Sequence, residues 1–258
     1  MLDEIVEKTK KRVEDAKKRI PLEEIKKDVS LMDVTDEFPF KKALSEEGMS
    51  IIAEVKKASP SKGLIAEDFD YIAIAKDYEQ AGASAISVLT EPFFFMGSDD
   101  YLSEIAQNVS IPILRKDFVV DEYMIWEAKL LGASAILLIV SVLDIVQLKK
   151  YLDLAHYLGL SAIVEVHDGD EIRKAMIVGA EIIGVNNRNL KDFTVDIENS
   201  INLRRCVSGD VIFISESGIK TKEDISKLNE NNVDAVLIGE TLMKSNDKMS
   251  MISELKNG

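Results

Sequence analysis

The sequence contains very little cysteine, histidine or tryptophan for a chain of 258 residues. With a single cysteine, Cys206, an internal disulfide is excluded. One cysteine and two histidines also argue strongly against a zinc cluster built from His and Cys ligands. A magnesium ion held by carboxylates is not excluded by this count, but no ligand set for a tightly bound metal is visible, so we expect no metal and no cofactor.

Positive charge and long hydrophobic runs are also scarce. Lys and Arg number 32 against 46 Asp and Glu, and the resulting net charge of −14 argues against binding to nucleic acids or anionic membranes. The longest apolar run, residues 135–140, is far shorter than the ~20 residues that span a bilayer. The N-terminus is charged at once, unlike a signal peptide, so a cytoplasmic location is expected. Local charges in a cleft could still bind a small anion, because salt screens the surface beyond ~8 Å.

The chain is expected to form one domain with an N-terminal helical extension. Apolar residues make up 46%, which is typical of a globular chain and excludes a disordered one. In residues 1–47, Leu2, Ile5, Val6 and Val13 have the spacing of an amphipathic helix. Further helices are predicted near residues 22–27 and 40–45. This segment is too short for a core of its own, so we expect it to pack on the remaining residues, 48–258.

From residue 49 onward, β-branched apolar runs alternate with helical patterns. The predicted strands cover residues 50–55, 85–89, 112–114, 135–140, 162–166, 182–185, 211–214 and 235–238. The helical patterns between them cover residues 71–80, 101–107, 121–131, 144–158, 170–178, 197–205 and 222–229. Eight such units with no hairpin signal favour a (β/α)8 TIM barrel, a single α/β domain. The alternative is an open doubly wound sheet, which usually has a glycine-rich loop after its first strand. Here that loop, residues 56–63, has one glycine.

Charged residues stand at the ends of several predicted strands, where a TIM barrel carries its active site. Glu54, Lys116 and Glu165 belong to odd-numbered strands, which can contribute side chains to one interior layer. A lysine there could have a lowered pKa and donate a proton, and a glutamate could have a raised pKa and accept one. The alternative interpretation is a structural network of ion pairs. His167, just past Glu165, is expected to be an exposed strand end.

Glycines and aromatic residues add two further signals. Gly218 and Gly239 follow the last two predicted strands directly, where backbone N–H groups beside helix N-termini favour a phosphate site. Phe93, Phe94 and Phe95 follow the second strand. They could line a pocket for a flat ring, with Phe118 in the same wall, or simply pack on the barrel rim.

The motifs at the strand ends resemble those of the indole-3-glycerol phosphate synthase family. The resemblance covers every strand in order, in residues 52–61, 90–98, 112–118, 137–139, 164–167, 184–190, 215–219 and 237–240. It implies a carboxy-lyase of tryptophan biosynthesis without a cofactor. The substrate would be 1-(2-carboxyphenylamino)-1-deoxyribulose 5-phosphate, which closes to indole-3-glycerol phosphate with loss of carbon dioxide and water. The N-terminal helices resemble those that the family places over the barrel mouth.

The resemblance also implies roles for individual residues. Lys116 would be the general acid at the ketone, Glu165 the general base in the dehydration, and Lys56 a phosphate ligand that helps the chemistry. The remaining implied site residues would orient or enclose the substrate and the catalytic groups. Glu54, Asn186 and Ser217 would position the ribulose part and the lysines, Ser59 and Arg188 would contact the carboxylate or orient the loop, and Glu216 would orient its neighbours. The phosphate would be held by Gly218, Gly239 and the backbone of Glu240, and the aromatic ring would be enclosed by Phe95, Phe118 and Leu137.

Two other readings remain open at this stage. One is a different phosphate-handling barrel, such as a phosphosugar isomerase, against which Lys116, Glu165 and an aromatic pocket argue. The other is a catalytically silent barrel that binds a partner through its N-terminal helices, which would be expected to lose some of the polar strand ends. For the enzyme we expect a monomer with a phosphorylated small-molecule substrate, and association with other enzymes of the pathway is left open.

Overall fold

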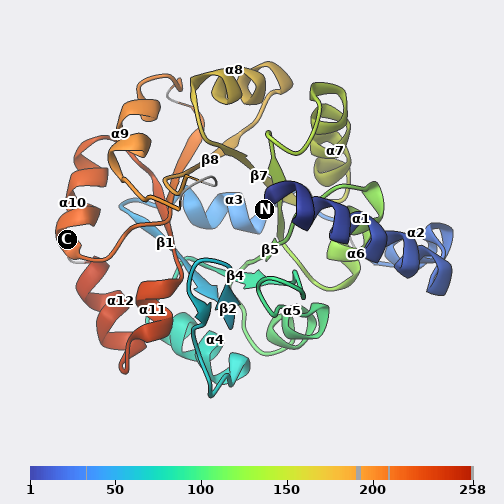
Figure 1. Ribbon diagram of the computed structural model, residues 1–258, viewed down its shortest axis with the longest axis horizontal. Coiled ribbons are helices and arrows are strands. Elements are labelled where there is room, and N and C mark those ends of the chain that lie inside the picture. The colour runs from blue at the N-terminus through green and yellow to red at the C-terminus, as the bar shows by residue number, and fades with distance from the viewer. Residues whose placement is uncertain (33, 190–192, 209, 257–258) are drawn as a thin grey trace.

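The structure is a computed structural model that describes residues 1–32, 34–189, 193–208 and 210–256. Within these residues eight parallel strands close into a barrel in the order β1-β10-β9-β8-β7-β6-β5-β4 (Figure 1). The predicted TIM barrel is confirmed, and the open sheet is excluded. The strands are β1 (Ser50–Val55), β4 (Ala85–Leu89), β5 (Ile113–Lys116), β6 (Ala135–Ile139), β7 (Ser161–Val166), β8 (Ile182–Asn186), β9 (Ile212–Glu216) and β10 (Ala235–Ile238).

Helices surround the barrel and follow its strands in turn (Figure 1). They are α4 (Tyr71–Gln80), α5 (Asp99–Ala106), α6 (Glu122–Leu130), α7 (Ile145–Tyr157), α8 (Gly169–Val178), α9 (Glu198–Arg204) and α10 (Lys222–Glu230), all close to the predicted ranges. Aspartates begin several of them. Asp144 caps α7 by accepting hydrogen bonds from the backbone N–H groups of Val146 and Gln147. Gly179 ends α8 with a φ of 82°, which a residue with a Cβ rarely adopts.

Four elements were not predicted. Two helices, α11 (Glu240–Lys244) and α12 (Lys248–Lys256), follow the last strand. The first loop contains a small antiparallel hairpin of β2 (Ala58–Ser59) and β3 (Gly63–Leu64), which no signal in the sequence indicated. Strands of two residues are too short to produce an alternating pattern in the sequence. None of the helices in the described ranges combines the length and apolar character needed to cross a bilayer.

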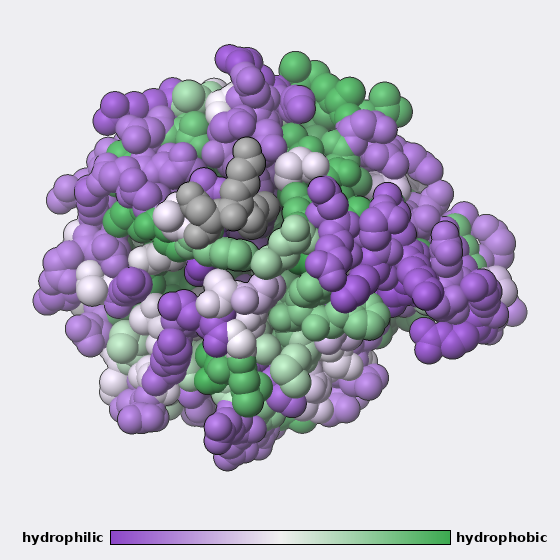
Figure 2. Space-filling model, viewed as in Figure 1, coloured by the Kyte–Doolittle hydropathy of each residue, from purple (hydrophilic) through white to green (hydrophobic). Residues whose placement is uncertain are grey.

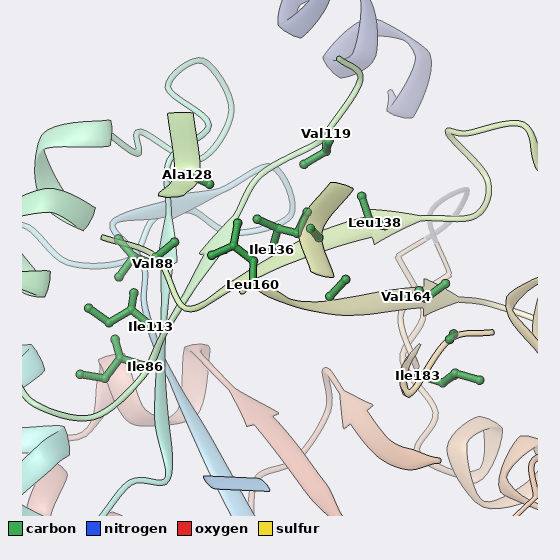
Figure 3. Packing of buried hydrophobic residues seen from close by; sticks show 14 of the residues in the cluster. Ile86, Val88, Ile113, Val119, Ala128, Ile136, Leu138, Leu160, Val164 and Ile183 are labelled. Atoms are coloured by element: carbon green, nitrogen blue, oxygen red, sulfur yellow. The ribbon is translucent and has the colours of Figure 1, made fainter. Parts of the chain in front are cut away.

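The strands bury both of their faces. Side chains on the outer face pack against the helices, and Figure 3 shows part of this layer, including Ile86, Val88, Ile136 and Val164. Side chains on the inner face fill the barrel, with Ile52, Leu114, Ile163 and Ile214 among them. Because neighbouring positions along a strand point to opposite faces, a polar residue at a strand end points either into the barrel mouth or toward the helices.

The N-terminal segment covers both ends of the barrel. Helix α1 (Leu2–Arg19) buries Ile5, Thr9 and Val13 of its amphipathic face, while Leu2 and Val6 remain partly exposed. The outward surface of α1 and of α2 (Leu22–Val29) is strongly hydrophilic, as Figure 2 shows. Helix α3 (Pro39–Leu44) lies at the opposite end from the mouth, since its Phe40 and Leu44 pack on the residues that begin the inner faces of the strands.

Candidate active site

A cavity of about 750 Å³ opens at the carboxyl ends of the barrel strands. Every residue that the resemblance implied for the site contributes to its wall: Glu54, Lys56, Ser59, Phe95, Lys116, Phe118, Leu137, Glu165, Asn186, Arg188, Glu216, Ser217, Gly218, Gly239 and Glu240. These residues come from segments that are up to 186 positions apart in the chain, so only closure of the barrel brings them together.

Four charged side chains form one interior layer at the base of this cavity. Glu54, Lys116, Glu165 and Glu216 stand at the ends of β1, β5, β7 and β9, which alternate around the barrel. Alternate strands contribute to the same layer in this fold. The prediction of a shared layer for Glu54, Lys116 and Glu165 therefore agrees with the geometry, and Glu216 is its fourth member.

Lys116 is the centre of this layer. Its Nζ donates a hydrogen bond of 2.6 Å to Glu216 Oε2 and lies 3.4 Å from Glu165 Oε2. Burial alone would lower the pKa of Lys116, but the carboxylates of Glu216, Glu165 and Glu54 outweigh it and raise the pKa. The suggestion of a lowered lysine pKa was therefore wrong, because the surrounding charges are mainly negative. Burial, with Glu165 and Glu54 nearby, raises the pKa of Glu216 against the opposing effect of Lys116.

A second ion pair lies on the β10 side of the mouth. Lys56 Nζ donates to Glu54 Oε1, and both side chains are mostly buried. A Cβ on Gly239 would overlap with this pair, so the glycine allows it to lie against the end of β10. Lys56 therefore stands beside one of the two glycines predicted to form the phosphate site.

Asn186 and Ser217 are tied together across β8 and β9. Ser217 Oγ donates to Asn186 Oδ1 at 3.0 Å, and the same oxygen accepts the backbone N–H of Arg188 at 3.0 Å. Ser217 has a φ of 70°, in the left-handed region. The buried Asn187 donates from Nδ2 to the carbonyl oxygen of Ser217 at 3.0 Å, which holds that backbone in place.

The predicted phosphate loops face cationic side chains. Gly218 has a φ of 91°, so the turn after β9 depends on glycine. The side chain of Glu240 is paired with Lys244 at 2.6 Å and with Lys62 at 3.5 Å. Although partial burial opposes it, these two lysines lower the pKa of Glu240. Both lysines line the cavity. They compensate the negative charge of Glu240 next to the expected phosphate site.

The apolar wall is built from residues of three neighbouring strands and the loops that follow them. The rings of Phe95 and Phe118 have centroids 6.1 Å apart, and Leu137 lies in the same cavity wall. Glu91 is fully buried and accepts backbone hydrogen bonds from the phenylalanine loop, including one of 3.1 Å from Phe95. Of the three consecutive phenylalanines, Phe95 lines the cavity. Phe94 packs under Lys8 of α1 instead, with 4.6 Å between Nζ and the ring centroid.

Several wall residues were not predicted. Met1, Leu2 and Ile5 from the start of α1 line the cavity, which places the N-terminal helix at the mouth. Lys62 and Lys244 line it as well. Lys244 stands four residues after Glu240 in the sequence, whereas no local pattern indicates Lys62. His167 is not an exposed strand end, because its side chain is 19% exposed and lies between two carboxylates. Leu190, the last residue of one family-like motif, lies outside the described residues.

The donor set of the site is that of an acid–base enzyme. In the described part of the chain, no three His, Cys, Asp or Glu side chains are grouped so that they could hold a metal ion. The cavity instead combines buried lysines and glutamates with an apolar wall and glycine turns. Such a site can move protons, stabilise developing charge and hold an anion.

Comparison with known proteins connects this geometry to a family. The sequence model of the family described as indole-3-glycerol phosphate synthase matches residues 2–255. A curated indole-3-glycerol phosphate synthase of Ruminiclostridium cellulolyticum is 53% identical over 256 residues, covering 99% of this chain and 98% of the relative. The one from Endomicrobium trichonymphae is 54% identical over 257 residues and covers all of both chains.

Solved structures share the architecture at low identity. The 3-hexulose-6-phosphate synthase from Salmonella typhimurium has a TM-score of 0.65 at 15% identity, covering 81% of this chain and 97% of its own. The thiamine phosphate pyrophosphorylase from Pyrococcus furiosus has a TM-score of 0.60 at 15% identity, covering 81% and 94%. These similarities show the barrel fold alone.

Proposed function

The chain belongs to the indole-3-glycerol phosphate synthase family, and we propose how its residues divide that family's reaction among themselves. The reaction is the ring closure of 1-(2-carboxyphenylamino)-1-deoxyribulose 5-phosphate, with loss of carbon dioxide and water, in tryptophan biosynthesis. The observation that carries the proposal is the layer of Lys116, Glu165, Glu216 and Glu54 at the base of a cavity that also has an apolar wall.

Ring closure is assigned to Lys116. The aryl carbon that bears the carboxylate attacks the ketone carbon, and the ketone oxygen takes up a proton from the ammonium group of Lys116. The raised pKa keeps Lys116 protonated before the reaction, which a proton donor requires. Glu216, at 2.6 Å, orients this ammonium group. The ring gains positive charge in this step, and the nearby carboxylates stabilise it.

Loss of carbon dioxide then returns its bonding electrons to the ring and restores aromaticity. In the final dehydration the hydroxyl group formed from the ketone takes up a second proton, supplied by solvent through the open mouth of the cavity, and leaves as water. We assign Glu165 as the base that removes the proton lost in this step. Its carboxylate lies 3.4 Å from Lys116 Nζ, so the two groups can act on adjacent atoms of one substrate.

The phosphate is assigned to the ends of β9 and β10. The backbone around Gly218, Gly239 and Glu240 would hold the phosphate oxygens, with Lys56 beside Gly239 as a cationic ligand. Asn186 and Ser217 would hold the ribulose hydroxyls, and Ser59 and Arg188 would contact the carboxylate. Phe95, Phe118 and Leu137 would enclose the aromatic ring.

Replacement of Lys116 by methionine tests the central assignment. Lys116→Met keeps the length of the side chain but removes its proton, so kcat should fall by about 10²–10⁴, the usual range for general acid–base catalysis. Lys150→Met, at an exposed lysine on α7, is the matched control and should keep wild-type turnover. Product formation is followed by indole fluorescence. Wild-type turnover by a folded Lys116→Met protein would contradict the assignment.

The chain is further proposed to act as a monomer in the cytoplasm. All the assigned site residues come from one chain, and a phosphate ester does not cross a lipid bilayer unaided. Light scattering at the concentration used for kinetics should give the mass of one chain, 28.7 kDa. A larger mass that persists on dilution would contradict this.

A further inference from the structure

His167 stands between two glutamates just outside the catalytic layer. Its ring nitrogen Nδ1 lies 3.2 Å from Glu171 Oε2, on α8, and its Nε2 lies 3.5 Å from Glu165 Oε1. Glu171 Oε2 also accepts the backbone N–H of His167 at 2.8 Å, so Glu171 is held in place by the residue it orients. The Nε2 atom is buried and has no hydrogen-bond partner among the described residues.

No neutral tautomer of this imidazole suits both of its neighbours. A neutral ring carries one N–H, so one ring nitrogen would present a lone pair to a carboxylate. With a proton on Nδ1 for Glu171, the bare Nε2 would face Glu165. The doubly protonated ring instead presents an N–H to each carboxylate, and it carries the positive charge that both of them favour.

We propose that His167 is a positioning residue for Glu165: its protonated ring, oriented by Glu171, holds the Glu165 carboxylate in place. Glu165 therefore has a cation on each side, Lys116 near Oε2 and His167 near Oε1. This inference rests on the proposed role of Glu165 as the base. It assigns to His167 no contact with substrate, since the cavity wall is formed by other residues.

The charged groups that face His167 from the surrounding elements are mostly acidic. They are Glu165 on β7, Glu171 on α8 and Glu216 on β9. Burial alone would lower the pKa of His167, but the hydrogen bond to Glu171 and the charges of all three glutamates raise it. The protonated ring should therefore persist to a pH above the ordinary value of about 6.5 for histidine.

Titration by NMR tests the charge of the ring directly. The chain has two histidines, so the imidazole signals of His167 are assigned by comparison with a His156→Gln variant. We expect the His167 signals to titrate above pH 6.5. In Glu171→Gln, which keeps an acceptor for Nδ1 but removes the charge, the midpoint should move to lower pH. A His167 ring that is neutral at pH 6.5 in the wild type overturns the proposal.

Kinetics test the consequence for Glu165. In His167→Gln the amide nitrogen can still reach Glu165, but the positive charge and its titration are lost. We expect kcat at neutral pH to fall about tenfold, as for the loss of charge from one hydrogen bond, with KM within twofold of the wild type. In the wild type, kcat should fall as the pH rises and His167 loses its proton. This fall should be absent in His167→Gln. His156→Gln should match the wild type at every pH.

The outcomes separate this inference from the assignment of Glu165. If Glu165→Gln is inactive but His167→Gln has the wild-type pH profile and kcat, the role of His167 is wrong and that of Glu165 stands. If Glu165→Gln keeps full activity, the assignment of Glu165 is wrong, and the kinetic role of His167 falls with it. A lower titration midpoint of His167 in Glu165→Gln would then still show that the two side chains interact.

Discussion

Arg12 of α1 donates hydrogen bonds from Nη2 to both carboxylate oxygens of Asp117, at 2.9 Å to Oδ1 and 2.8 Å to Oδ2. Asp117 directly follows Lys116, and its side chain is completely buried. The hydroxyl of Thr90 donates to the same carboxylate at 2.6 Å. The N-terminal helix is thereby bonded to the strand end that carries Lys116, although the two segments are separated by about a hundred residues of chain.

Removal of Arg12 should destabilise the protein and weaken its active site. Arg12→Gln leaves the buried Asp117 carboxylate without its cation, and breaking such a pair usually costs about 3 kcal/mol. Urea unfolding measures this loss, and steady-state kinetics should show a raised KM. Arg19→Gln, at an exposed position of the same helix, should change neither. Equal unfolding free energies for the two variants would show that the Arg12–Asp117 pair contributes little.

Two glycines inside the barrel mouth should not tolerate a methyl group. A Cβ on Gly184 would overlap with the carboxylate of Glu216, and one on Gly239 would overlap with Glu54 and Lys56. Gly184→Ala and Gly239→Ala should each lower kcat/KM by about 10², the effect expected when catalytic groups are displaced by about 1 Å.

Gly169→Ala is the matched control for these two variants. Gly169 begins α8, has open space around its Cα and has no positive φ. Alanine there should keep full activity and stabilise the protein by about 0.5–1 kcal/mol. Full activity in Gly184→Ala or Gly239→Ala would mean that the charged layer adapts without cost.

Deletion of residues 1–30 should leave a barrel that still closes. It removes α1 and α2, and with them Met1, Leu2 and Ile5 from the cavity wall. We expect a less stable protein with a raised KM and a smaller effect on kcat, the pattern of lost uniform binding. Deletion of residues 1–44 also removes Phe40 and Leu44 and should prevent folding. Unchanged kinetic constants after the shorter deletion would favour a partner-docking role for these helices.

His156 should make the protein less stable in mild acid. Burial beside Phe38 lowers the pKa of His156, with Lys41 and Lys149 adding to this and Glu181 and Asp153 opposing it. Because the folded state binds this proton less readily than the unfolded chain, stability falls as the pH drops below about 6.5. The decrease in Tm between pH 7.5 and pH 5 should be smaller in His156→Gln. An identical decrease in both proteins would contradict this.

Activity should survive exhaustive dialysis against a chelator. The proposed steps move protons, form one carbon–carbon bond, and break a second carbon–carbon bond and a carbon–oxygen bond. The residues that carry them out are lysines and glutamates of the chain itself. Fluorescence assays before and after dialysis should give the same kcat. A loss that added Mg²⁺ restores would reveal a carboxylate site for a metal.

The barrel could be predicted from the sequence because the apolar residues of each strand indicate by themselves that the strand is buried. Runs such as residues 135–140 are apolar on both faces, and polar residues follow where the strands leave the core. The layer formed by Glu54, Lys116 and Glu165 could be predicted because strand order alone places alternate strand ends together. The roles assigned to single residues came from the family resemblance.

Properties that depend on distant neighbours could not be predicted. The pKa of Lys116 rises because three carboxylates from three other strands surround it, which no local pattern indicates. His167 is enclosed because Glu171 of the next helix turns back toward it. Arg12 looks like any surface arginine of an amphipathic helix until the fold places Asp117 beside it.

The helix α3 gives the barrel a closed end. Phe40 and Leu44 pack among the first inward-facing residues of the strands, so substrate and products cannot pass through that end. Substrate must therefore enter, and carbon dioxide, water and the indole product must depart, through the side where α1 lies. Substrate and product therefore share a single opening, and slow release of the bulky indole product delays binding of the next substrate molecule. A substitution that weakens the packing of Met1 and Leu2 at the cavity wall should therefore speed product release and also lower the affinity for substrate.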